Sequence, residues 1–103
     1  MHIVIFITAK DKPEAKAISD QLLQDKLIAC ANIIDGIQSV FWWQQKIDEA
    51  QEVLLVLKSR RDLFEKIVRT VKSLHSYEVP EIIALPIVDG NPDYLRWIDE
   101  SLG

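Results

Sequence analysis

Apolar residues fall along this chain in two kinds of pattern. Continuous apolar runs are typical of buried strands, whereas apolar residues spaced three and four apart are typical of one helix face. The runs predict strands at 2–8, 28–43, 47–58 and 82–88, and the spaced patterns predict helices at 11–25, 63–74 and 91–102. The runs at 2–8 and 53–57 are apolar at nearly every position, so we expect both faces of these strands to be covered.

Short polar motifs mark where the predicted elements begin. The segment Asp11-Lys12-Pro13-Glu14 combines an N-cap side chain, an early proline and a glutamate three residues after the cap. Ser59 with Asp62 predicts a second capping pair, ahead of the helix at 63–74. Pro86 has no backbone N–H to donate, which favours an edge or bulged position for the last strand.

The order of these elements is β-α-β-β-α-β followed by a helix. That order is the split βαβ arrangement of ferredoxin-like folds. We therefore predict an α+β sandwich in which two helices cover one face of a four-stranded antiparallel sheet. A length of 103 residues suits one domain, and no repeat, linker or low-complexity tract divides residues 1–103.

The central hairpin is longer than the domain that carries it. Its two strands, joined by a turn at Gln44-Gln45-Lys46, have about 15 residues each, which corresponds to roughly 50 Å. A domain of this size is only on the order of 35 Å across. The tip, with Trp42 and Trp43, should therefore project, and a closed ring of chains that share hairpins would cover it. Glycine permits a bulge or kink, so we expect a bend near Asp35-Gly36 in the first of these strands. The alternative is a hairpin folded back at that bend.

Composition and charge exclude several partners and locations. Apolar residues make up 49% of the chain and charged residues 27%, as in folded proteins, and the net charge of −4 argues against a nucleic-acid partner. No apolar run reaches the ~20 residues of a membrane span. Residues 1–6 lack the basic leader and cleavage site of a signal peptide. The single cysteine, Cys30, fits a reducing compartment, so we expect a cytoplasmic protein.

Two residues are candidate metal ligands. His75 lies in a short polar block between a predicted helix and a predicted strand, and a neutral imidazole can bind a metal. Cys30 can do so as a thiolate. Each residue also has a structural interpretation, because His75 can be a hydrogen-bonded loop residue and Cys30 a small buried apolar side chain.

Four residues are candidates for a ligand cleft. Lys58 ends an apolar strand, so its ammonium must reach water, a ligand anion or a carboxylate such as Glu81. Trp43 and Tyr77, together with Lys58, suit a small anionic or planar ligand in a cleft between subunits. The chain has no Ser-His-Asp order, glycine-rich phosphate loop or zinc-ligand spacing, so we predict no enzymatic activity.

Six segments, in order along the chain, resemble the CutA family of divalent-ion-tolerance proteins. They are Thr8-Ala9, Leu27–Asn32, Ser39–Trp43, Glu52 with Leu57-Lys58, His75–Ile82 and Asp93–Ile98. The resemblance implies a ferredoxin-like subunit in a tight homotrimer with interlocked hairpins, and a link to copper and other divalent cations. Ile7 and Leu74 stand where some family members have a cysteine and a histidine. This chain therefore keeps only His75 and Cys30 as soft-metal ligands.

The sequence thus leads to two hypotheses. The first is a non-enzymatic homotrimer that acts in the tolerance of divalent metal ions and binds Cu(II) or another divalent cation weakly through His75 and Cys30. The alternative is a trimeric sensor, similar to the PII signalling proteins, that binds a small anionic ligand in the cleft between subunits.

Overall fold

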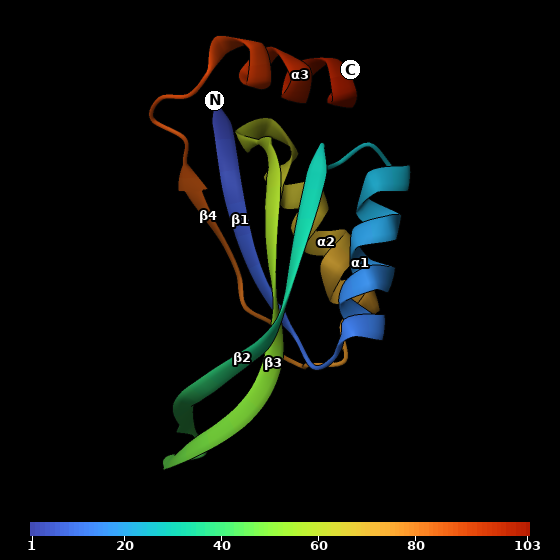
Figure 1. Ribbon diagram of the computed structural model, residues 1–103. Coiled ribbons are helices and arrows are strands. Elements are labelled where there is room, and N and C mark those ends of the chain that lie inside the picture. The colour runs from blue at the N-terminus through green and yellow to red at the C-terminus, as the bar shows by residue number, and fades with distance from the viewer.

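The chain forms four strands, three α-helices and one short 3-10 turn. A computed structural model describes all of residues 1–103 (Figure 1). In chain order the elements are β1 (His2–Ala9), α1 (Lys12–Gln24), β2 (Cys30–Trp43), β3 (Lys46–Arg60), the 3-10 turn η1 (Arg61–Leu63), α2 (Phe64–Leu74), β4 (Ile82–Pro86) and α3 (Pro92–Leu102). Every predicted strand and helix is present, in the predicted order.

One antiparallel sheet holds all four strands in the order β2-β3-β1-β4. The helices α1 and α2 lie on the same side of this sheet, and α3 lies across the end of the strands near the N-terminus (Figure 1). This arrangement is the α+β ferredoxin-like fold predicted from the element order. The strand β4 lies at the sheet edge, as predicted from Pro86.

The hydrophobic core lies between the sheet and the two helices α1 and α2. Its largest members are the odd-numbered strand residues and the inward helix residues, namely Ile3, Ile5, Ile7, Val53, Leu55, Leu57, Ile18, Leu22, Ile67 and Val71. The even-numbered residues of the same strands, among them Phe6, Leu54 and Val56, are only half-buried on the other face of the sheet. We call this second face the open face. The expectation that these strands are covered on both faces is wrong within one chain, because α1 and α2 share one side.

The predicted capping pair Ser59 and Asp62 is wrong. Ser59 lies inside β3, where its buried hydroxyl donates to the Leu27 carbonyl at 2.6 Å. The strand continues to Arg60 because β1 pairs with it over that full length. The helix α2 then begins at Phe64 without a side-chain cap.

The start of α1 agrees with the prediction, and the end of β4 differs from it. The start of α1 is as predicted, because Asp11 Oδ1 accepts a hydrogen bond from the Glu14 N–H at 2.9 Å. The strand β4 ends at Pro86 rather than at Val88. Its last partner on β1 is Ile3, and little of β1 remains beyond that pair.

Beyond a bulge in β2, the β2–β3 hairpin leaves the body of the domain. The register of the two strands shifts between Ile34 and Ile37, and Gly36 has a φ of +77°, a left-handed conformation that glycine adopts readily. The predicted bend at Asp35-Gly36 is thus confirmed. We call residues 37–52 the arm, and its ribbon curves away from the sheet and helices in Figure 1.

The arm ends in an exposed apolar tip. Gln44 and Gln45, both with positive φ, form the turn. The side chains of Trp42, Trp43 and Ile47 are 73%, 50% and 65% exposed. The molecule measures 44 Å along its longest axis, against 26 and 22 Å along the others. The hairpin therefore projects from its own domain as predicted, and the folded-back alternative is wrong.

Candidate functional site

The polar block after α2 is a hydrogen-bonded junction built around a buried imidazole. The side chain of His75 is fully buried. Its Nε2 lies 2.7 Å from the Thr8 carbonyl oxygen, and its Nδ1 lies 3.0 Å from the backbone nitrogen of Tyr77. A carbonyl can only accept and an N–H can only donate, so His75 is the neutral tautomer with its proton on Nε2. Both ring nitrogens therefore hold the loop in place.

Glu14 joins the same loop to the first helix. Its carboxylate accepts hydrogen bonds from the Lys10 N–H at 3.1 Å and the Ser76 N–H at 2.9 Å, and it lies 3.8 Å from His75 Nδ1. Burial by itself would raise the pKa of Glu14. The hydrogen bonds from Ser76 and Lys10 stabilise the charged form more strongly, so the pKa of this carboxyl lies below its ordinary value.

Tyr77 extends the junction to the arm. Its hydroxyl donates to Glu52 Oε2 at 2.8 Å, and its ring centre lies 4.7 Å from that of His75. Burial, together with the hydrogen bond to the charged Glu52, raises the pKa of Tyr77. Glu52 is paired with Ile37, directly beyond the bulge. Hydrogen bonds thus connect β1 and α1, through this loop, to Glu52, where the arm meets the body of the domain.

Near the other end of the sheet, Lys58 contacts Cys30 instead of Glu81. The two residues face each other across β2 and β3, with Lys58 Nζ 4.0 Å from Cys30 Sγ, and Lys58 also donates to the Asn32 side-chain oxygen. Glu81 precedes β4, whose first residue pairs with β1 three positions from the partner of Lys58, or about 10 Å along the strand. Within one chain, Lys58 therefore does not pair with Glu81, its candidate partner.

Three residues at these contacts were missed as site residues. Burial, together with the neighbouring Cys30 thiol, raises the pKa of Tyr94 on α3. Glu14 was recognised only as a capping residue. Glu52 could have been found from its position, because it is the last carboxylate before β3 becomes apolar.

The cleft candidates do not meet within one chain. Trp43 pairs with Lys46 at the tip, Tyr77 contacts Glu52, and Lys58 lies further along β3. The β3 positions involved are Lys46, Glu52 and Lys58, and each lies six residues, or about 20 Å, from the next. A cleft that contains all three therefore needs a second chain.

The donor set also does not fit a soft-metal site within one chain. His75 contacts Thr8, which pairs with Leu54, whereas Cys30 pairs with Lys58, four residues or about 13 Å further along β3. No group of three or more His, Cys, Asp or Glu side chains has metal-binding geometry. Metal binding through His75 and Cys30 therefore stays a prediction.

The fold and its projecting arm define a class of protein, the ferredoxin-like α+β proteins with an extended central hairpin. Residues 3–101 match the family described as CutA1 divalent ion tolerance protein. The divalent-cation tolerance protein CutA of Thermus thermophilus is 43% identical over the full length of both chains. The rice chloroplastic protein CutA 1 is 42% identical over 96% of this chain, which spans 56% of the rice protein.

Solved structures agree with this assignment. The structure of the periplasmic divalent cation tolerance protein CutA from Archaeoglobus fulgidus is 44% identical and covers all of both chains with a TM-score of 0.97. The structure of the Thermus thermophilus protein gives the same TM-score at 43% identity, again with full coverage. The chain belongs to the CutA1 divalent ion tolerance family.

The names of the relatives describe tolerance proteins and not enzymes. Two of them are called chloroplastic and periplasmic, so a cytoplasmic location stays a prediction for this chain. None of the helices has the length and apolar character needed to cross a membrane.

Proposed function

We propose that this chain is a non-enzymatic protein that acts as a homotrimer in the tolerance of divalent metal ions. The tolerance role is supported by membership of the family and by the names of full-length relatives. The observation that carries the assembly is the projecting arm, because its tryptophans are exposed in a single chain.

The arm and the open face both lack a partner in one chain. Apolar side chains are exposed on the open face, namely Ile34, Ile83 and Leu85, and Trp97 is exposed on α3. Monomeric soluble proteins rarely expose large contiguous apolar patches. The strands β2 and β4 also leave two sheet edges unpaired. A closed ring in which each arm lies on the next chain would bury the tip, the open face and an edge together.

Weak Cu(II) binding forms part of this proposal. A ring nitrogen of His75 can bind a metal only after it gives up the Thr8 carbonyl or the Tyr77 N–H. Cys30 is too far along the sheet to share the ion within one chain. Copper titration by calorimetry should therefore show low affinity, reduced further in His75→Gln or Cys30→Ser. Affinity unchanged in both variants would remove these residues as ligands.

Growth under metal stress tests the tolerance role. Cells that lack their own family member should grow at higher Cu(II) concentrations when they produce this chain than when they carry an empty vector. A tip variant with Trp42→Lys and Trp43→Lys should lose the protection. A control with Gln24→Lys, which adds charge at an exposed position on α1 away from the arm, should keep it.

The two parts of the proposal fail separately in this experiment. No growth advantage from the unsubstituted chain would contradict the tolerance role. Full protection by the tip variant would contradict the requirement for assembly through the arm.

The proposed location is the cytoplasm, because the one cysteine is free and suits a reducing compartment. Fractionation of producing cells tests this. Recovery of the protein with a non-cytoplasmic fraction would contradict it.

A further inference from the structure

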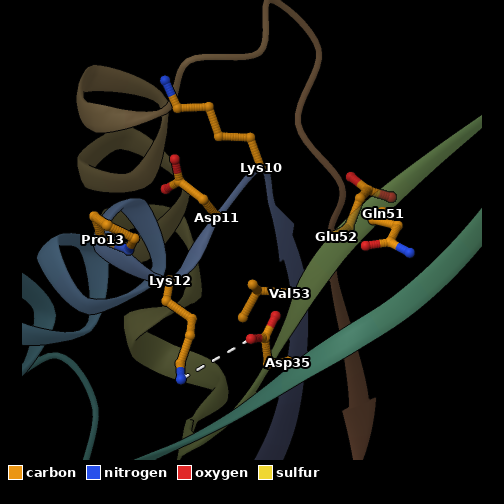
Figure 2. A pocket seen from close by; sticks show the side chains of 8 residues that line it. All are labelled: Lys10, Asp11, Lys12, Pro13, Asp35, Gln51, Glu52 and Val53. Atoms are coloured by element: carbon orange, nitrogen blue, oxygen red, sulfur yellow. Dashed lines mark ion pairs between the residues drawn. The ribbon is translucent and has the colours of Figure 1, made fainter.

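The arm leaves the body at a point that is held on both of its strands. On β2, Asp35 Oδ2 lies 3.9 Å from Lys12 Nζ. On β3, Glu52 accepts the hydrogen bond from the Tyr77 hydroxyl. Figure 2 shows Lys12 extending from the start of α1 toward Asp35, with Glu52 on β3 lining the same shallow pocket. We call these two interactions the root contacts.

The two root contacts differ in strength. Lys12 and Asp35 form an ion pair whose side chains are 67% and 59% exposed, so water and salt screen it. The bond between Tyr77 and Glu52 is part-buried and has a charged acceptor, which makes it the stronger kind of hydrogen bond. The Tyr77–Glu52 bond therefore contributes more to the position of the arm.

The backbone at Tyr77 is itself held in place by hydrogen bonds to the body of the domain. Its backbone N–H donates to the buried His75, whose other nitrogen donates to the Thr8 carbonyl. The neighbouring Ser76 N–H donates to Glu14 on α1. The tyrosine hydroxyl is therefore held by the rigid body of the domain.

The root is also the place where the hairpin can bend. The bulge at Asp35-Gly36 interrupts the pairing of β2 with β3. From Gly36 to Gln44 the arm is about 26 Å long, so a rotation of about 10° at the root moves the tip by about 5 Å. A small loss of restraint at Glu52 therefore becomes a large displacement of the tip.

We propose that the hydrogen bond between Tyr77 and Glu52, positioned by His75, sets the direction in which the arm leaves the body. The restraint acts within one chain, so it goes beyond the proposed function. In the proposed homotrimer, the same restraint would direct each arm toward a neighbouring chain before the chains assemble, and this consequence rests on the proposed function. The polar block after α2 thereby has a conformational role that does not involve a metal ion.

Electron–electron distance measurement between two spin labels tests the proposal. The labels are placed at exposed positions through Gln24→Cys on α1 and Gln45→Cys at the tip, in a Cys30→Ser background. Labelled chain is refolded with a large excess of unlabelled chain carrying the same root residues. Each assembly then holds at most one labelled copy, and only the distance within a chain is observed.

The unsubstituted root should give one narrow distance distribution. Tyr77→Phe and Glu52→Ala should each broaden or shift it by about 5 Å, the tip displacement expected from the arm length. Glu52→Gln keeps an acceptor oxygen and should restore the narrow distribution. Tyr94→Phe, which removes a hydroxyl away from the root, should leave it unchanged.

The outcomes separate this proposal from the proposed function. A Tyr77→Phe distribution identical to that of the unsubstituted chain would overturn the role of the hydrogen bond, whatever the oligomeric state. A monomeric mass for the unsubstituted chain would contradict the homotrimer, whereas the distances would still test the root. Circular dichroism on each variant confirms that it is folded before distances are compared.

Discussion

Replacement of His75 by alanine should destabilise the fold by several kcal/mol. The imidazole is fully buried and makes two hydrogen bonds, to the Thr8 carbonyl and from the Tyr77 N–H. Alanine leaves both backbone groups without these partners, and each such loss costs about 1–3 kcal/mol in a protein interior. The lost packing of the ring adds to this, so we expect a total of about 3–5 kcal/mol. That is a large share of the roughly 5–15 kcal/mol that stabilises a typical domain.

Urea unfolding followed by circular dichroism measures this loss. The chain concentration must be the same in all samples, because association shifts apparent stability. His2→Ala is the matched control, since the only hydrogen bond of the His2 side chain is to Asp99, a side chain that is 46% exposed. We expect His2→Ala to cost much less stability than His75→Ala, because water and salt screen the exposed pair. A His75→Ala chain as stable as the His2→Ala control would refute the structural role of His75.

Three further predictions follow from buried or constrained groups. Ser59→Ala should cost about 1–3 kcal/mol in urea unfolding, because it removes the buried hydrogen bond to Leu27; an unchanged midpoint contradicts this. The lowered pKa of Glu14 contributes stability that is complete above the pKa of the unfolded chain and is lost as pH falls through the folded pKa. Glu14→Gln should therefore flatten the acid side of the stability–pH curve, and an acid side as steep as before would count against it. Gly36→Ala should cost about 1 kcal/mol through its positive φ alone, because an added Cβ meets no atom within 4 Å. A much larger loss of stability in thermal unfolding would contradict this, because it would mean that the added methyl group meets a neighbour.

The element order could be predicted because each element is encoded locally. Apolar runs, helical spacing and the cap at Asp11 depend on residues a few positions apart. The bend at Gly36 is also a local signal. The length of the hairpin, compared with the size of the domain, was sufficient to predict that the tip projects.

The site could not be predicted in the same way, because its contacts join distant segments. His75 meets Thr8, and Tyr77 meets Glu52, only after the sheet register is fixed. The same limit explains the errors. The local motif at Ser59 predicts the start of a helix. Ser59 lies in a strand instead, because β1 extends the pairing of β3 to Arg60.

The cleft candidates illustrate a second limit. Trp43 and Lys58 have the right chemistry for a common ligand, but chemistry alone does not show their separation along β3. Strand register places Trp43 opposite Lys46, the first residue of β3, whereas Lys58 lies near the other end of β3. Only a neighbouring chain could bring such positions together.

The most direct test of the account is the mass of the protein in solution, measured by light scattering over a range of dilutions. The exposed arm predicts a closed ring, and the proposed homotrimer has a mass of about 35 kDa, three times the 11.8 kDa of one chain. This mass should persist on dilution and fall in the Trp42→Lys, Trp43→Lys variant. A constant mass of 11.8 kDa for the unsubstituted chain would contradict the central claim.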